Sequence, residues 1–423
     1  MDETLQTILS AISNSLDDMI DLQRRLTAVP ALSPESGGEG EMKKALELAS
    51  WLREKGFPEP EWYFAPDDRA AEGKRPSLVV TLPGRSDKRN FWIMSHLDVV
   101  PPGEEGLWKS DPFTLKVESD RLIGRGVEDN QQGMVCSIFA VKALLEAGIM
   151  PADTVKLLFV ADEENGSVYG IQYLLAKENL FGARDYVLVP DGGDPEGATL
   201  EIAEKSTLWL KFCVSGKQCH ASRPDQGVNA FVAGSALVCA LEKLKDLYPQ
   251  QNSLFDPPGS TFVPTKKEAN VPNINTLPGE DVFYLDSRIL PEIPLAEVFR
   301  SMDEIQERIE KHYGVTIRRS EVQRTESKAT PEDSGFLEVM KKVILQEYGI
   351  QARPVGIGGG TVGAYLRNYD LETVVWSRID ETAHMPNEYC KIDNLLGDCR
   401  IMARLMLQGY PGIPEERKQP SPG

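Results

Sequence analysis

The segment Thr154-Val-Lys-Leu-Leu-Phe-Val-Ala-Asp-Glu-Glu, residues 154–164, is an apolar run that ends in three acids. Further apolar runs follow the same pattern, at residues 77–82, 91–94 and 186–189. They are too apolar to keep one face in water, which is typical of strands in a sheet that helices cover on both faces. Helical patterns that end near Gly or Pro lie between them, at residues 42–56, 133–148 and 168–178. We therefore expect an α/β domain with a central mixed sheet covered by helices.

A different order of elements begins near Ser206. Strand, helix, two strands, helix and strand follow one another near residues 207–214, 228–247, 260–264, 280–289, 294–313 and 315–323. This β-α-β-β-α-β order is typical of a ferredoxin-like α+β domain. From about residue 330 the first pattern returns, with helices at 334–348 and 391–408 and a strand at 373–376.

A small domain is therefore expected to be inserted into a larger one. The expected boundaries give a first part of the α/β domain at 1–205, the inserted domain at 206–327, a second part of the α/β domain at 328–408 and a tail at 409–423. The tail is rich in proline, and we expect it to be disordered.

The composition excludes several classes of partner. The chain has 423 residues, with 46 Lys+Arg against 65 Asp+Glu and a formal net charge of −19. Such a surface repels phosphate backbones, so we expect no nucleic-acid partner. No apolar run approaches the roughly 18 residues that a membrane span needs. The N-terminus carries acids where a signal peptide has a basic start, so we expect no membrane partner.

The N-terminus and the cysteines give two further expectations. Apolar side chains recur at helical spacing from Leu5 to Ile20, which predicts an amphipathic surface helix. The six cysteines form no CxxC pair, and most lie in apolar or motif segments. That usage favours a reducing compartment, so we expect a cytoplasmic protein.

Acidic and imidazole side chains follow the apolar strands at their carboxyl ends. His96 and Asp98 follow the run at 91–94, residues 162–164 follow the run at 154–160, and Asp191 follows the run at 186–189. The Gly-rich turn Ile123-Gly-Arg-Gly-Val-Glu-Asp129 delivers another carboxylate just before a helix. Open α/β sheets gather ligand-binding groups beyond these strand ends. So many acids without matching Lys or Arg would require a cation among them.

The residue types indicate which cation this would be. Histidine and carboxylate ligands without thiolates are typical of zinc, cobalt or manganese in a reactive site rather than of structural zinc. The alternative is that each acid lies on a solvated loop, which is plausible for any one segment but less so for all of them together. The chain has only four histidines, and His312, in a charged helix end, is expected to be a surface residue.

These segments resemble a known family, the M20 metallopeptidases. The resemblance is carried by Ser95-His-Leu-Asp-Val-Val, Gly124-Arg-Gly-Val-Glu-Asp, Asp162-Glu-Glu-Asn-Gly, Gly216-Lys-Gln-Cys-His-Ala-Ser-Arg-Pro, Asn275-Thr-Leu-Pro, Gly358-Gly-Gly-Thr and Ala383-His-Met-Pro-Asn-Glu. The matches run in family order from about residue 30 to 408. The resemblance implies a catalytic domain with two divalent metal ions, and an inserted lid domain through which the chain forms a homodimer.

The resemblance also implies a ligand set. His96 and Asp191 would bind one metal, Glu164 and His384 the other, and Asp129 would bridge both. The family usually has a cis peptide after the bridging Asp, here Asp129-Asn130. We expect zinc, with cobalt or manganese as alternatives.

Three residues are predicted to take part in catalysis. Asp98 lies two residues past His96 on the same side of an extended segment, so it should accept the other imidazole N–H; alternatively it caps a turn. Glu163 points away from its neighbour Glu164 and would act as the general base on a water molecule. The resemblance implies that His220 of the lid domain donates a hydrogen bond to the oxyanion in the partner subunit's site; alternatively it caps a turn.

Further matches indicate how the substrate would be held. Asn275, Arg288, Gly360 and Thr361 correspond to positions that bind the substrate's carboxylate and backbone. Arg288 could equally form a structural ion pair with Asp286. Glu204-Lys-Ser stands where desuccinylases have two arginines, which leaves the acyl group open.

The sequence is therefore interpreted as a dinuclear metal-dependent amidohydrolase acting on an N-acyl amino acid. The favoured type is a succinyl-diaminopimelate desuccinylase or an acetylornithine deacetylase. One alternative is a dipeptidase or carboxypeptidase of the same family. Two alternatives from other classes are a non-catalytic binding protein on the same fold, and an acidic scaffold that binds no metal.

Overall fold

The computed structural model describes residues 3–410, which form two compact units. Unit 1 comprises residues up to 202, 330–354 and from 365 onward, and unit 2 comprises 203–329 and 355–364. Each unit is described by itself. The predicted disordered tail lies, from residue 411, outside the described residues.

Unit 1 is built on an eight-stranded sheet, whose strand order is β1-β2-β6-β3-β7-β16-β8-β15. These strands are β1 (Glu61–Pro66), β2 (Lys74–Leu82), β3 (Ser86–His96), β6 (Asp153–Val160), β7 (Tyr186–Asp194), β8 (Thr199–Glu204), β15 (Arg353–Ile357) and β16 (Glu372–Arg378). The inner strands β6, β3, β7 and β16 run parallel, while β1–β2, β2–β6 and β16–β8 are antiparallel pairs. The expected mixed sheet is confirmed.

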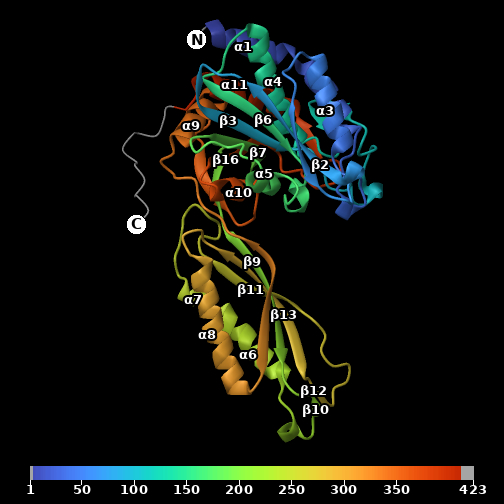
Figure 1. Cartoon of the computed structure of the whole chain (residues 1–423), viewed down its shortest axis with the longest axis vertical. Helices are drawn as coiled ribbons and strands as arrows, with labels where there is room; N and C mark the ends of the chain where they lie inside the picture. The colour runs from blue at the N-terminus through green and yellow to red at the C-terminus, as the bar shows by residue number, and fades with distance from the viewer. Residues whose placement is uncertain (1–2, 411–423) are drawn as a thin grey trace. The chain divides into compact units, whose positions relative to one another are not determined.

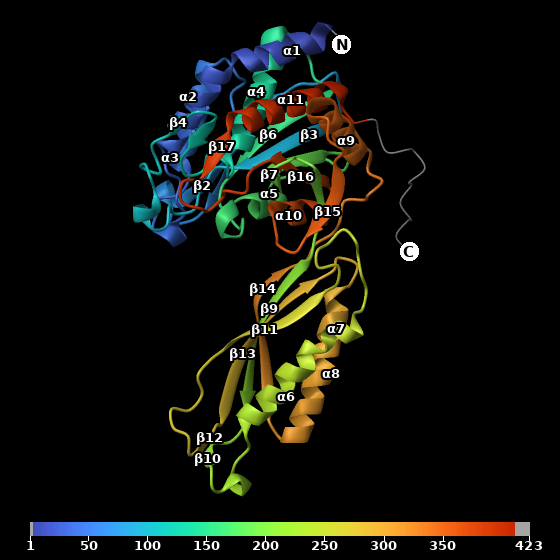
Figure 2. The same ribbon diagram turned by 180° about the vertical axis from the view of Figure 1, so that it is seen from behind.

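Helices cover this sheet on both faces (Figures 1 and 2). The helices of unit 1 are α1 (Glu3–Asn14), α2 (Leu16–Thr27), α3 (Met42–Glu54), α4 (Gln131–Ala147), α5 (Ile171–Lys177), α9 (Gly335–Tyr348) and α11 (Ile392–Gln408). In Figure 1, α4 and α11 lie on one side of the sheet and α5 on the other. Most of α4 is buried, because it packs against the sheet strands β3 and β7 and against the helices α1, α2 and α11.

The N-terminal segment differs from its expected single helix. It forms two helices, α1 and α2, which meet at Ser15. The Ser15 hydroxyl donates to the carbonyl of Ala11 at 2.9 Å, and such bonds compete with the helical backbone pattern. Ile8, Ile12 and Met19 are fully buried, so the apolar stripe does pack on the core as its spacing predicts.

Smaller elements surround the sheet. A three-stranded sheet pairs β4 (Lys116–Glu118), β5 (Arg121–Ile123) and β17 (Tyr389–Lys391) in the order β17-β5-β4. Short 3-10 helices of unit 1 lie at Pro34–Ser36, Ala71–Gly73, Glu105–Leu107 and Glu163–Asn165, and one of unit 2 lies at Pro224–Gln226. Within residues 3–410 no helix combines the length and the apolar composition needed to cross a bilayer.

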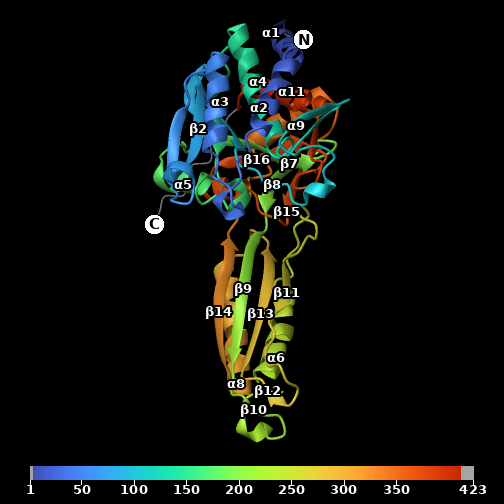
Figure 3. The ribbon, with the colours of Figure 1, turned by 90° about the vertical axis from the view of Figure 1, so that its right-hand side faces the viewer.

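Unit 2 has the predicted β-α-β-β-α-β order. Its elements are β9 (Ser206–Ser215), α6 (Ala230–Glu242), α7 (Leu244–Leu247), β11 (Thr261–Lys267), β13 (Glu280–Ile289), α8 (Leu295–Tyr313) and β14 (Thr316–Thr325). The antiparallel sheet has the order β11-β13-β9-β14, and α6 and α8 cover one of its faces (Figure 3). Leu208, Leu210 and Phe212 of β9 are fully buried, whereas Trp209 between them is exposed.

Unit 2 also has a short two-stranded antiparallel sheet, in which β10 (Cys219–His220) pairs with β12 (Thr276–Leu277). Helix α10 (Val362–Asn368) belongs in its first residues to unit 2 and in its last residues to unit 1.

Candidate metal centre

The predicted ligands of unit 1 meet beyond the carboxyl ends of three parallel strands. His96 is the last residue of β3, Glu163 and Glu164 follow β6, and Asp191 lies in the second half of β7. Asp129 precedes α4. The donor atoms of His96, Glu163 and Asp191 lie within 4.8 Å of one another, and so do those of His96, Asp129 and Glu164. The strands thus bring together residues that are up to 95 positions apart in the sequence.

Asp129 lies between the two histidines. Its Oδ1 is 2.8 Å from His96 Nε2, and its Oδ2 is 3.2 Å from His384 Nε2. His384 Nε2 is also 3.1 Å from Glu164 Oε2, and His96 Nε2 is 3.6 Å from Asp191 Oδ1. The Asp129-Asn130 peptide is cis, as the family resemblance implies. Each oxygen of Asp129 therefore faces a different histidine, as a bridging carboxylate would require.

Electrostatics shows that this cluster is short of positive charge. Burial opposes protonation of His96, but the carboxylates of Asp191 and Asp129 outweigh it and raise the pKa of the imidazole well above its ordinary value. Hydrogen bonds to Asp129 and Glu164 raise the pKa of His384 to about 10. Burial, together with Asp191, raises the pKa of Glu163 well above its ordinary value. The shifts have one cause, a cluster of carboxylates with few positive charges near it, and a bound cation would supply the missing charge.

The donors fit a divalent cation. Within residues 3–410, the ion pairs of Asp129, Glu164 and Asp191 involve His96 and His384 and no lysine or arginine. Imidazole and carboxylate donors without thiolates suit zinc, cobalt or manganese. The site therefore has the charge deficit and the chemistry of a metal centre.

Asp98 makes both of the contacts that the sequence offered as alternatives. The His96 Nδ1 lies 2.9 Å from the backbone carbonyl of Asp98 and 3.6 Å from its carboxylate, with which it forms an ion pair. The carboxylate also accepts the backbone N–H groups of Glu163 and Glu164, each at 3.1 Å. The first N–H groups of a helix lack partners within it, so the 3-10 helix at Glu163–Asn165 attracts this acid. Asp98 thus holds the backbone of two predicted site residues and caps their turn.

A buried ion pair that the sequence did not predict supports the same turn. Arg75 is fully buried and donates through Nε to Glu41 at 2.6 Å, and Arg75 also lies 3.5 Å from the Asp162 carboxylate. Glu41 in turn accepts the backbone N–H of Asp162 at 3.3 Å. Neither Glu41 nor Arg75 lies in a recognisable motif, because their pairing depends on contacts 34 positions apart.

Replacing Arg75 with methionine is expected to lower the free energy of unfolding by about 3–5 kcal/mol. The substitution leaves Glu41 buried without its counter-charge, and such losses are costly. Urea or guanidinium unfolding of the two proteins measures the difference. The control is Arg53→Met, which removes an ion pair to Glu59 that is more than 60% exposed and should leave the midpoint almost unchanged. Equal midpoints for wild type and Arg75→Met would contradict the expectation.

The predicted residues of unit 2 lie in two places. His220 lies in β10 and Asn275 directly precedes β12, the two strands that pair with each other. The His220 side chain is exposed, and its Nδ1 accepts the Ser222 N–H at 3.1 Å. The Asn275 carbonyl accepts the N–H of Ala221 at 2.9 Å. The pairing of β10 with β12 therefore fixes the backbone around both residues and leaves the His220 ring exposed.

The other three predicted residues, Arg288, Gly360 and Thr361, lie in or beside the Gly-rich loop at residues 358–361. Arg288 donates to both oxygens of Asp286, at 2.8 and 3.2 Å, and to the carbonyl of Gly358 at 3.1 Å. Gly360 precedes Thr361, whose N–H and hydroxyl donate to Glu204 at 2.9 and 2.6 Å. The ion pair that was the alternative for Arg288 is thus present.

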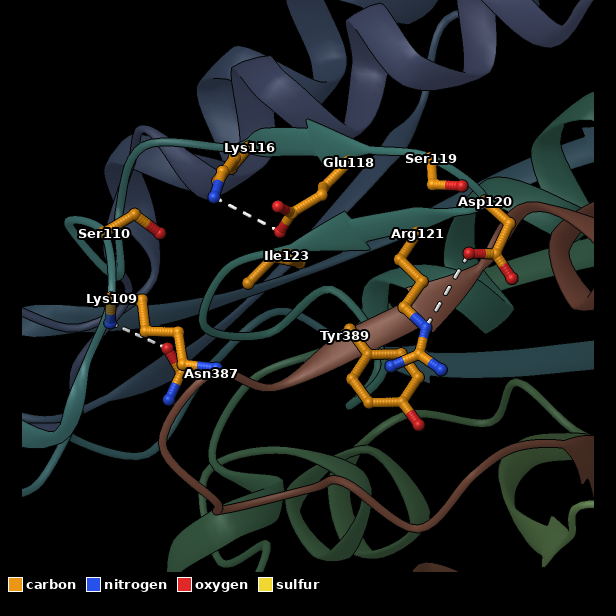
Figure 4. Close-up of a pocket in the computed structure, with 10 residues that line it drawn as sticks. All are labelled: Lys109, Ser110, Lys116, Glu118, Ser119, Asp120, Arg121, Ile123, Asn387 and Tyr389. Atoms are coloured by element: carbon orange, nitrogen blue, oxygen red, sulfur yellow. Dashed lines mark hydrogen bonds and ion pairs between the residues drawn. The ribbon is translucent and has the colours of Figure 1, made fainter.

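A cavity of about 420 Å³ lies beside the three-stranded sheet (Figure 4). It is lined by charged residues that pair with one another: Lys116 lies 3.2 Å from Glu118, and Arg121 lies 3.8 Å from Asp120. The Arg121 guanidinium also stacks over the Tyr389 ring. None of the predicted site residues lines it.

Comparison with known proteins identifies the family. Residues 92–408 match the sequence profile of peptidase family M20/M25/M40. The chain is 38% identical over 404 residues to an uncharacterised metallohydrolase of Methanococcus maripaludis, covering 90% of this chain and 96% of the relative. It is 26% identical over 419 residues to a succinyl-diaminopimelate desuccinylase of Methylobacterium sp., covering 93% of this chain and 96% of the relative.

Solved structures share the fold. The aminopeptidase PepT of Bacillus cereus has a TM-score of 0.73 at 18% identity, covering 92% of this chain and 98% of that one. A dinuclear metal-binding peptidase of the M20 family from Bacillus subtilis has a TM-score of 0.64 at 15% identity, covering 94% and 99%. The profile match spans most of the chain and the methanococcal relative most of its length. The chain therefore belongs to peptidase family M20/M25/M40, and it is a metal-dependent hydrolase.

Proposed function

We propose that the protein is a dinuclear amidohydrolase that cleaves the amide bond of an N-acyl amino acid. The observation that carries this proposal is the position of Asp129, whose two carboxylate oxygens face His96 and His384 at 2.8 and 3.2 Å. One carboxylate between two separate donor groups is the arrangement that two neighbouring cations require.

The residues divide into two ligand groups. His96 and Asp191 would hold one divalent ion, Glu164 and His384 would hold the second, and Asp129 would contribute to both. Zinc is the proposed metal, with cobalt or manganese as alternatives. When bound, such ions polarise the amide carbonyl and lower the pKa of a water molecule towards about 7.

Glu163 is the proposed general base. Its carboxylate lies within 4.8 Å of the donor atoms of His96 and Asp191, and its backbone N–H is fixed by Asp98. It takes a proton from the attacking water as the new C–O bond forms. It then delivers this proton to the departing nitrogen as the C–N bond breaks, so the products are a carboxylic acid and a free amine.

The proposed substrate is an N-acyl diamino acid, succinyl-diaminopimelate or acetylornithine. The similarity to a succinyl-diaminopimelate desuccinylase over 93% of the chain supports this class. Asn275, Arg288, Gly360 and Thr361 would hold the substrate's carboxylate and backbone. A peptide substrate of a dipeptidase or carboxypeptidase is the second candidate, because the chain matches a family of peptidases.

The remaining proposals concern assembly and location. Residues 206–327 would form the lid and the dimer contact of a homodimer, and His220 of the partner subunit would donate a hydrogen bond to the oxyanion. A cytoplasmic location is supported by the six free cysteines.

The proposal is tested by metal analysis of the purified protein and by a hydrolysis assay. Metal content per chain is measured after loading with zinc, cobalt or manganese, and the loaded enzyme is assayed on N-acyl amino acids and dipeptides. Two metals per chain with release of a free amine are expected. No metal uptake under any condition would overturn the proposal, and cleavage of dipeptides alone would favour the second candidate.

Replacing His220 with alanine is expected to lower kcat by roughly 10²–10³-fold, the usual cost of losing one oxyanion donor. Metal content should not change, because His220 belongs to unit 2 and the ligands to unit 1. Steady-state kinetics and metal analysis measure both quantities. His312→Ala, at the end of α8, is the matched control and should keep the wild-type rate. Normal turnover of His220→Ala would leave His220 with a structural role only.

A further inference from the structure

Glu388 holds the turn that carries Asp129. It lies four residues after His384 and is fully buried. One carboxylate oxygen accepts from Arg125 Nη1 at 2.6 Å and from the Gly126 N–H at 2.9 Å. The other oxygen accepts the backbone N–H groups of Glu128 and Asp129, at 3.0 and 3.1 Å. A single side chain from the His384 loop thus binds four residues of the Asp129 turn.

Glu128, from the Asp129 turn, binds the loop that carries His384. Its carboxylate is buried, and one oxygen accepts the N–H of Asp380 at 2.8 Å. The other oxygen accepts the Thr382 hydroxyl at 2.7 Å and the Thr382 backbone N–H. Asp380 and Thr382 lie four and two residues before His384. A side chain from the Asp129 turn therefore binds the loop that carries His384.

Both loops need such support. Residues 124–130 and 379–388 lie outside the strands and helices of the sheet, so no strand ladder or helix fixes their backbones. Gly126 has φ +87°, and a Cβ there would lie 2.7 Å from Val99, so the turn is tightly packed. His384 itself has φ +62°. Buried carboxylates that accept several N–H groups fix such backbones, because any displacement would leave a charge buried without partners.

We propose that Glu128 and Glu388 are positioning residues of the metal centre. Glu128 holds the loop that carries His384, and Glu388 holds the turn that carries Asp129. This inference rests on the proposed dinuclear site. Neither residue is a ligand, because the carboxylate oxygens of both already accept hydrogen bonds from the opposite loop. Outer partners of this kind typically contribute 10–100-fold to metal affinity.

Loss of Glu388 and loss of Glu128 should affect metal binding differently. Glu388 binds the backbone of Asp129, the proposed ligand of both ions, so its loss should weaken both. Glu128 binds the loop of His384, the proposed ligand of one ion, so its loss should weaken that ion and spare the other. A merely structural role would produce no such difference in stoichiometry.

The test is titration of the metal-free protein with cobalt(II), followed by visible absorption and equilibrium dialysis. We expect two tight equivalents for wild type, one tight equivalent for Glu128→Gln with the second weakened about 10–100-fold, and weakening of both for Glu388→Gln. Thr382→Val removes one donor to Glu128 and supplies a milder variant if Glu128→Gln does not fold. Circular dichroism establishes that each variant is folded.

Asp185→Asn is the matched control. Asp185 is also buried and accepts from the Asn90 N–H, Trp92 Nε1 and the Gly182 N–H, but it lies at the amino ends of β3 and β7, opposite the site. It should keep two tight equivalents even if it melts earlier. Two unchanged equivalents in all variants, or equal losses in Glu128→Gln and Asp185→Asn, would overturn the inference. Wild-type protein that binds fewer than two ions would instead overturn the proposed function.

Discussion

Replacing Glu163 with glutamine is expected to reduce kcat by roughly 10²–10⁴-fold while both metal ions stay bound. The amide keeps the size of the side chain but cannot take a proton from water. Because the backbone N–H of Glu163 is held by Asp98, the substitution leaves the turn in place. Steady-state kinetics gives the rate, and metal analysis of the same sample gives the occupancy.

The geometry makes this experiment discriminating. The Glu163 carboxylate is close enough to His96 and Asp191 to be a ligand itself, since the three donor atoms lie within 4.8 Å of one another. A ligand role predicts that Glu163→Gln loses one ion along with its activity, whereas a base role predicts that it loses activity alone. Glu105→Gln, in an exposed 3-10 helix, is the control and should keep both.

Replacing Asp129 with alanine is expected to abolish detectable hydrolysis and to reduce metal content at both positions. Asp129 is the residue whose two oxygens face both histidines, so its removal deprives each proposed ion of a charged ligand. The stabilisation of the fold by added zinc should fall as well, because the stabilisation by a bound ligand rises with the logarithm of its affinity for the folded state. Inductively coupled plasma analysis and melting curves with and without zinc measure the two effects.

Two companion variants sharpen the result. His384→Ala removes a ligand from one proposed ion only and should keep about one equivalent, whereas Asp129→Ala should keep neither. Asp120→Ala changes an acid that pairs only loosely with Arg121, at 3.8 Å, and should behave as wild type. A fully loaded Asp129→Ala protein would show that Asp129 does not bridge the ions.

Much of the fold could be predicted because its signals are local. The helix expected at 133–148 is α4, Gln131–Ala147, and the strand expected at 280–289 is β13 with the same bounds. Apolar runs and helical spacing decide these elements within a dozen residues. The same runs placed His96 and Glu163 at strand ends, which is where the structure has them, whereas β7 continues past Asp191 to Asp194. Their roles as ligands and base remain predictions.

The parts that sequence could not predict depend on partners far along the chain. Strand β5 pairs with β17, which lies more than 260 residues later, and neither is long enough to give a pattern. The carboxylate of Asp98 lies 3.6 Å from the His96 imidazole but also accepts the N–H groups after β6, and this second contact depends on where a separate strand ends. Glu128 and Glu388 lay within recognised motifs, but nothing in either motif indicates that each binds the other's loop.

The strand order of unit 1 has a consequence for biosynthesis. Strand β16, from residues 372–378, lies between β7 and β8, whose residues are made far earlier. While the ribosome adds residues 205–371, β16 is not yet made, so the edges of β7 and β8 that pair with it lack their partner. Unpaired strand edges favour aggregation of partly made chains. We expect that truncation before residue 372 yields an aggregating product that depends on chaperones, and that metal capture is the last event of maturation, after His384 has left the ribosome.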